Sequence, residues 1–89
     1  MGFEWDEAKR LVNLDKHGID FIDVPEVFEG DIVTLEDDRY SYGEQRFVTF
    51  GLLQGRVVVH TDRGESIRII SARKATKNEQ RSYFQELAD

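Results

Sequence analysis

The sequence contains no cysteine, a single proline and no long apolar run. Without cysteine, neither a disulfide framework nor a metal site built from thiolates can form. No segment approaches the roughly 20 apolar residues that cross a bilayer, and the charged N-terminus MGFEWDEAKR is unlike a secretory signal. We therefore expect a cytoplasmic protein without a membrane partner.

Sequence motifs of several enzyme classes are also absent. The chain has no phosphate-binding P-loop, no HExxH zinc helix and no GxSxG nucleophile turn. Its metal-ligating residues are scattered, and the acidic run at 36–38 is more typical of a solvated loop than of a cation site. We expect neither a metal nor a cofactor, so any chemistry has to come from the side chains themselves.

Charge is distributed unevenly along the chain. The formal net charge is −6, which argues mildly against nucleic acid binding. Residues 1–62 carry 14 acidic and 6 basic side chains, whereas residues 63–81 carry 6 basic and 2 acidic ones. A basic C-terminal quarter on an acidic domain is typical either of an anion-binding surface or of a solvated corner, and charge alone does not separate the two.

The N-terminal residues predict an edge strand followed by a helix. Residues 3–5 are apolar, and Asp6 is placed to cap a helix that runs to about His17, with Gly18 just beyond its end. The spacing of four apolar residues predicts one buried helix face, made of Ala8, Leu11, Val12 and Leu14.

Two further helices have recognisable starts. One is expected to begin near Asp23 and end before Gly30, which leaves Pro25 harmless in the first turn. The other opens with Thr76 and Glu79 at the spacing of a capping box and runs to about Leu87. The residues expected to pack are Val24, Val27 and Phe28 in the first of these helices, and Tyr83, Phe84 and Leu87 in the second.

Between these helices the pattern changes to strands. Strands are predicted at 31–35, 46–53, 56–62 and 66–71, with a polar loop at 36–45 and tight turns between the others. The whole chain, residues 1–89, is long enough for one domain and too short for two. We predict an α+β fold in which an antiparallel meander of about four strands carries its helices on one face.

The face without helices would then be polar. Alternation along the strands allows Arg46, His60 and Arg68 to meet there, although a lone histidine is more often an ordinary half-buried sheet residue. In the stretch SIRIISARKA (66–75), strict alternation would turn Arg73 away from Arg68. We expect the strand to end or bulge near Ser71 and Ala72, which would let Arg73 swing to the same edge as Arg68.

Five segments of the sequence resemble the BrnT family of bacterial toxins. They are FEWDEAK (3–9), KHGIDF (16–21), GEQRF (43–47), VVVHTDRGESIRIISARKA (57–75) and NEQRSYF (78–84). The resemblance implies a fold like that of the RelE and ParE toxins, and a ribonuclease that blocks translation. It also implies a BrnA-like antitoxin of the ribbon-helix-helix class, through which alone the toxin reaches operator DNA.

The resemblance suggests RNA cleavage without a metal, and candidate residues follow from that chemistry. Proton transfer needs a base and an acid, and a cationic group has to hold the phosphate. The candidates for proton transfer are His17, Glu44 and His60, and those for the phosphate are Arg46, Arg68 and Arg73. Candidate contacts to the RNA backbone are Lys9, Lys16, Arg63 and Lys74, and candidates for stacking on a base are Trp5, Tyr40 and Tyr42.

Two other functions remain open at this stage. The domain can be a non-enzymatic module that holds the antitoxin, which the net charge of −6 suits better than RNA binding. It can also be a gyrase poison of the ParE kind, since fold alone does not fix activity.

Overall fold

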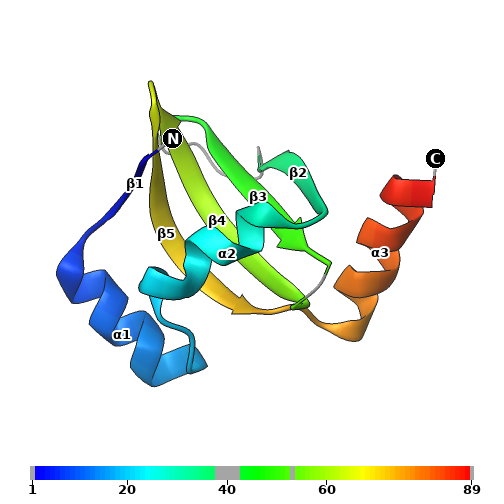
Figure 1. Ribbon diagram of the computed structural model, residues 1–89, viewed down its shortest axis with the longest axis horizontal. Coiled ribbons are helices and arrows are strands. Elements are labelled where there is room, and N and C mark those ends of the chain that lie inside the picture. Colours follow the sequence, from blue (N-terminus) through cyan, green and yellow to red (C-terminus); the bar gives the residue numbers. More distant parts are fainter. Residues whose placement is uncertain (1, 38–42, 53, 89) are drawn as a thin grey trace.

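The computed structural model describes residues 2–37, 43–52 and 54–88, with side chains described as far as residue 86. Its elements follow the chain in the order β1 (Gly2–Trp5), α1 (Glu7–His17), the short 3-10 helix η1 (Phe21–Asp23), α2 (Val24–Glu29), β2 (Ile32–Asp37), β3 (Arg46–Gly51), β4 (Arg56–Arg63), β5 (Ser66–Lys74) and α3 (Lys77–Ala88) (Figure 1). The α+β class is confirmed. The candidates Tyr40 and Tyr42 lie outside the described residues.

One sheet of five strands forms the centre of the molecule. The strands lie side by side in the order β1-β5-β4-β3-β2 (Figure 1). Strands β2 to β5 are antiparallel neighbours, whereas β1 pairs in parallel with β5 at the far edge. The N-terminal strand is therefore an edge strand, as its short apolar pattern predicted.

The helix ends follow the local sequence signals. The Asp6 carboxylate accepts a hydrogen bond from the Lys9 backbone N–H at 3.2 Å, and Gly18 closes α1 with a positive φ of 71°. At α3 the capping box is complete, because the Glu79 N–H donates to the Thr76 hydroxyl and the Thr76 N–H donates to the Glu79 carboxylate.

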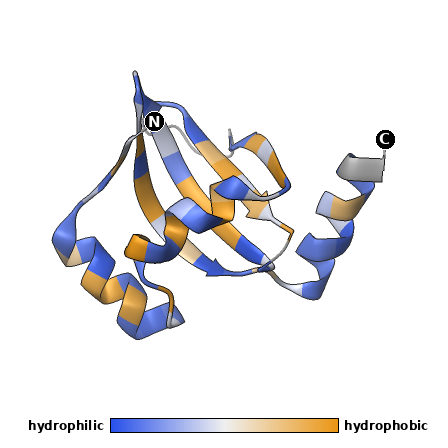
Figure 2. Cartoon of the chain, in the orientation of Figure 1, coloured by the Kyte–Doolittle hydropathy of each residue, from blue (hydrophilic) through white to orange (hydrophobic). Residues whose placement is uncertain are grey.

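Helices lie on both faces of the sheet, which corrects the predicted one-sided arrangement. Val57 and Val58 are neighbours in β4 and both are fully buried, so each face of this strand is covered. The Val58 face packs against η1 and α2, whose hydrophobic residues appear in Figure 2. The Val57 face packs with Phe50 against Tyr83 of α3, and the Phe50 and Tyr83 rings stack with centroids 4.7 Å apart.

A β-bulge at Ile70 interrupts the pairing of β4 with β5. Val59 pairs with Ser71 but the next residue, His60, pairs with Ile69, so Ile70 is left out of the ladder. The bulge reverses the alternation, and Arg68 and Arg73 consequently face the same side of the sheet. Of the two predicted alternatives, a strand end near Ser71 and Ala72 is wrong, because β5 continues to Lys74, whereas a bulge is confirmed one residue earlier, at Ile70.

Arg73 does not swing toward Arg68, which corrects a second part of that prediction. Its two terminal nitrogens each lie 2.7 Å from a carboxylate oxygen of Glu79 in α3. This bidentate pair, with further hydrogen bonds from the helix cap, lowers the pKa of Glu79 to about 2. Arg73 thus anchors α3 to the sheet.

Helix α1 faces the opposite way from its prediction. Leu11, Val12 and Leu14 are 53%, 65% and 37% exposed, so the expected apolar face points to solvent. The buried residue is Asn13, whose amide donates to the Ile19 and Ala72 carbonyls and accepts from the Ala72 N–H. The pairing of β1 with β5 ends at Ile69, so the Asn13 side chain takes the place of a strand partner for the backbone groups of Ala72. Phe84 of α3, also expected to pack, is 52% exposed.

Candidate active site

Charged side chains form a row across the sheet face that also carries α3. Arg68 of β5 pairs in register with Thr61 of β4 on one side and with Glu4 of β1 on the other. Arg46 of β3 pairs with Asp37 of β2. Phe47 of β3 pairs with His60 of β4, so the preceding residue, Arg46, lies beside the residue that follows His60, which is Thr61. We call these five residues, Asp37, Arg46, Thr61, Arg68 and Glu4, the charged row.

The two arginines of the charged row are spaced to hold one anion. They are separated by a single strand, so their Cα atoms are about 10 Å apart at the usual strand spacing. Thr61 between them is only 3% exposed, so neighbouring side chains cover it. Two arginines on either side of one small residue suit a phosphate group, which arginine binds with paired N–H donors.

Ion pairs at the end of the charged row near β1 are long and exposed. Glu4 lies 3.9 Å from Arg68 and 4.0 Å from Arg63, and Arg63 lies 3.6 Å from Glu44. Exposed pairs at such distances contribute little to stability. Arg63 and Arg68 can therefore turn to a bound phosphate at small cost, whereas the short bidentate pair of Arg73 with Glu79 is far harder to break.

Two grooves adjoin the charged row. The sheet groove, about 240 Å³ in volume, lies between the row and α3, over Val48 and Val59. The helix groove, about 330 Å³, lies between α1 and the bulge of β5 and is lined in part by Ser71. Val59 and Ser71 are paired neighbours in the ladder, so the two grooves approach one another there. The residues of the predicted site that line the helix groove are Lys9, Lys16 and His17.

His60 lies on the opposite face of the sheet, which corrects its predicted place beside Arg46 and Arg68. It is 2% exposed, and its ring packs against Phe28 and Phe47. Its Nδ1 is 3.1 Å from the Asp62 carboxylate, and its Nε2 is 2.7 Å from the Thr49 hydroxyl. His60 is therefore a buried structural residue and cannot reach a substrate on the charged row.

The hydrogen bonds of His60 define its protonation. A carboxylate can only accept, so Nδ1 carries the proton and the neutral ring accepts the Thr49 hydroxyl hydrogen at Nε2. Thr49 in turn lies 2.7 Å from the Thr34 hydroxyl, which extends the row of hydrogen bonds to β2. Burial lowers the pKa of His60, and the neighbouring Asp62 only partly offsets this, so the folded protein favours the neutral ring.

The pH dependence of stability should follow His60. Because its pKa is lower in the folded than in the unfolded protein, acidification favours the unfolded chain. We expect the free energy of unfolding to fall as the pH drops below the ordinary histidine pKa of 6.5. Urea unfolding between about pH 7.5 and pH 5.5 measures this slope. His60→Gln should flatten it and His17→Gln should not, and an unchanged slope in His60→Gln would show that another group is responsible.

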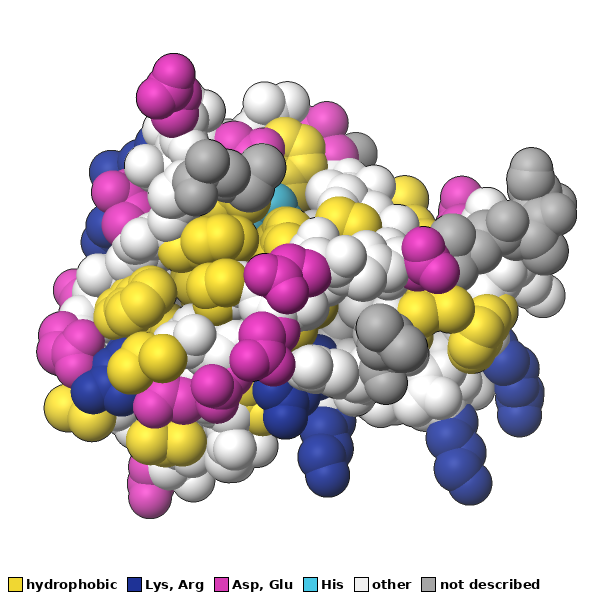
Figure 3. Space-filling view, in the orientation of Figure 1, with side chains coloured by type: hydrophobic (Ala, Val, Ile, Leu, Met, Phe, Trp, Pro, Cys, Tyr) yellow, Lys and Arg dark blue, Asp and Glu magenta, His cyan; other side chains and the backbone are white. Residues whose placement is uncertain are grey.

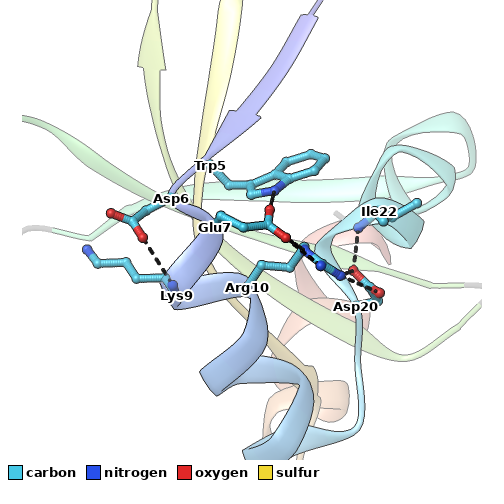
Figure 4. A network of polar contacts seen from close by, with 7 residues as sticks. All are labelled: Trp5, Asp6, Glu7, Lys9, Arg10, Asp20 and Ile22. Atoms are coloured by element: carbon cyan, nitrogen blue, oxygen red, sulfur yellow. Dashed lines mark hydrogen bonds and ion pairs between the residues drawn. The ribbon is translucent and has the colours of Figure 1, made fainter.

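Trp5 belongs to a polar network that fixes α1 rather than to the charged row. Its indole N–H donates to the Glu7 carboxylate, and Glu7 and Asp20 both accept from Arg10 (Figure 4). Its ring also meets the buried ring of Phe21 edge-on, with centroids 6.3 Å apart. This geometry favours a role in packing over the predicted stacking on a base.

The sheet register determines where the remaining candidate Lys74 lies and which residues of the charged row were not predicted. Lys74 is exposed at the end of β5, paired with Arg56, and it alternates with Arg73 away from the charged row. Sequence reasoning missed Glu4, Thr61 and Asp37. No local signal identifies them, because the parallel pairing of β1 with β5 joins residues 64 positions apart in the chain.

Figure 3 shows carboxylates and apolar side chains over the face on which α2 lies, with several lysine and arginine side chains projecting along its lower edge. Among the described residues, no group of three histidine, aspartate or glutamate side chains is placed to hold a metal ion. No helix in the described part of the chain is long and apolar enough to cross a membrane.

Comparison with known families identifies the class. A model described as a ribonuclease toxin of type II toxin–antitoxin systems matches residues 5–79, which is most of the chain. The family of that model is BrnT, and the protein belongs to it. A search of the curated proteins found no match. Membership of a type II system implies an antitoxin partner.

Proposed function

We propose that the protein is a metal-independent endoribonuclease that cleaves RNA on the charged row and thereby inhibits translation. The observation that carries the proposal is the pair Arg46 and Arg68, which flank Thr61 on one sheet face in a chain of a ribonuclease family. Their fixed positive charges are suited to the charge that develops on a phosphate during cleavage. The likeness of the fold to RelE and ParE toxins belongs to the same proposal.

The proposed reaction is an internal transesterification. The ribose 2′ oxygen attacks the adjacent phosphorus, the bond to the 5′ oxygen breaks, and the products are a 2′,3′-cyclic phosphate and a 5′ hydroxyl. A base takes the 2′ proton, and an acid gives a proton to the leaving oxygen. Glu44 is the candidate base because its carboxylate is 40% exposed beside Arg63. His17 is the candidate acid, since it lines the adjoining helix groove.

The other basic residues are assigned to the RNA backbone. Arg63 lies beside Glu4 at the end of the charged row, and Lys9 and Lys16 line the helix groove, so an RNA strand that runs from the row into the helix groove would meet all three. Lys74 would contact the RNA only beyond the charged row. Arg73, held by Glu79, is proposed to position α3 beside the bound RNA, with a weaker direct contact to phosphate.

The proposed partner is a BrnA-like antitoxin of the ribbon-helix-helix class, through which the complex reaches operator DNA. The proposed location is the cytoplasm, where RNA and antitoxin are both present.

Incubation of the purified protein with RNA in EDTA tests the proposal. We expect cleavage to continue at an undiminished rate, because arginine and not a metal ion stabilises the charge. Cleavage only after divalent metal is added would contradict the mechanism. Intact RNA together with growth arrest would instead favour a gyrase poison, which a parallel supercoiling assay detects, and intact RNA without arrest would favour a binding module.

A further inference from the structure

Helix α1 presents its apolar side to solvent. Its polar residues Arg10, Asn13 and His17 follow the i, i+3, i+7 spacing of one helix face, and this face lies against the body of the protein. On the other side, Val12 is 65% exposed and Leu11 is 53% exposed. A surface helix of a monomeric protein normally has the reverse arrangement, so this face is built to be covered by a partner.

The apolar surface extends beyond the outer face of α1. Ile22 of η1 is 59% exposed. On the other flank, Ala8 and Val12 line the helix groove together with Ile70, the residue that the bulge releases from the ladder. Apolar side chains also reach the surface over α1 in Figure 3. The result is an elongated apolar strip along one helix, a shape that suits an amphipathic segment laid beside it.

The charges beside this strip define the chemistry of the partner. Lys9 and Lys16 stand on either side of Val12 in the helix groove, and none of the described residues that line it carries a carboxylate. An apolar segment flanked by aspartate or glutamate therefore complements the surface. RNA fits it less well, because its exposed centre is aliphatic and His17 is the one ring among the described residues that line it, so it offers no platform for successive bases. A second copy of the chain also fits less well, since each copy carries a net charge of −6.

We infer that the outer face of α1, defined by Leu11, Val12 and the helix groove, is the docking site for an amphipathic, acid-flanked segment of the antitoxin. The family supplies the partner, and the inhibition rests on the proposed function: the segment covers Lys9, Lys16 and His17 and so blocks the path of RNA into the helix groove. Antitoxin binding and RNA cleavage thus compete for one surface.

The test is the affinity of purified toxin variants for the antitoxin encoded beside the toxin gene, measured by calorimetry. Val12→Asp should weaken binding by about 30-fold or more, because an unpaired charge enters an apolar contact. Phe84→Asp is the matched control, since Phe84 is an exposed apolar residue of α3 at 52%, and it should bind like the parent protein. Lys9→Glu combined with Lys16→Glu should weaken binding further and reduce its dependence on salt.

Each result decides the inference separately from the proposed function. Circular dichroism establishes that Val12→Asp is folded, and Leu11→Asp, at a residue that is 53% exposed and is not among those that line the helix groove, should lose antitoxin affinity while its RNA cleavage matches the parent and resists added antitoxin. Unchanged antitoxin affinity in folded Val12→Asp would overturn the inference. Loss of RNA cleavage in that variant would then assign the surface to RNA, and loss of self-association would assign it to a second copy of the chain. If the parent protein cleaves no RNA but Val12→Asp still loses the antitoxin, the docking site stands and the ribonuclease proposal fails.

Discussion

Replacing Arg68 with alanine is expected to lower kcat/KM for RNA cleavage by about 100-fold or more, the usual loss when one group that stabilises developing charge is removed. Arg68 stands in the charged row between Thr61 and Glu4. The protein should remain folded, because the ion pair to Glu4 is 3.9 Å long and half-exposed, and such pairs contribute at most about 1 kcal/mol. Single-turnover cleavage of a labelled RNA measures the effect.

Two further variants separate charge from geometry at this position. Arg68→Lys keeps the charge but loses the planar pair of donors, so we expect an intermediate rate. Arg81→Ala removes an exposed arginine of α3 outside the charged row and should cleave like the parent. Equal rates for Arg68→Ala and Arg81→Ala would show that Arg68 takes no part in the reaction.

Replacing Asn13 with leucine is expected to cost the most stability of any single change considered. Asn13 satisfies three backbone groups, two on Ala72 and one on Ile19, at distances of 2.9–3.1 Å. Leucine has a similar size but leaves all three groups buried without partners, at a cost of about 3 kcal/mol or more. For a domain of this length the Tm should fall by roughly 10–20 °C, measured by thermal unfolding.

The matched variants test whether hydrogen bonding is the cause. Asn13→Gln keeps the donors and the acceptor of the amide but displaces them by one methylene, so its Tm should lie between those of the parent and Asn13→Leu. Asn78→Leu changes an exposed asparagine in the first turn of α3 and should shift the Tm only slightly. A small shift in Asn13→Leu would mean that water replaces the lost contacts.

Local signals in the sequence were enough to predict most helices and strands. Asp6, Gly18 and the Thr76–Glu79 capping box act through hydrogen bonds within a few residues, and each of them marks the helix end that it predicted. The strands were recognised from β-branched and aromatic residues in the same way. Their ends were less certain, and β5 runs three residues beyond its predicted end.

The orientation of these elements depended on contacts that are distant in sequence. The apolar pattern of α1 predicted a buried face, but the polar edge of β5 at Ala72 needs a donor and an acceptor, and Asn13 supplies both. Because Asn13 has to face Ala72, the opposite face of α1, which carries Leu11 and Val12, is exposed to solvent. The bulge at Ile70 likewise decides which face Arg73 takes, and its position is not written in any turn residue.

The candidate site was predicted in part. Arg46 and Arg68 do share a face, and Arg73 shares it through the bulge, whereas His60 lies on the other side among aromatic rings. Alternation gives the relative faces within one strand, but comparison between strands needs the register. Glu4 enters the row only through a parallel pairing between the two ends of the chain.

The chemistry of the RNA ends tests the proposed internal transesterification most directly. An RNA oligonucleotide is incubated with the protein in EDTA, and the products are analysed by mass spectrometry. We expect a 2′,3′-cyclic phosphate and a 5′ hydroxyl, and no cleavage where a 2′-deoxy nucleotide precedes the scissile bond. Products with 5′ phosphates, or cleavage beside a 2′-deoxy nucleotide, would contradict this mechanism, because water and not the ribose hydroxyl would then be the attacking group.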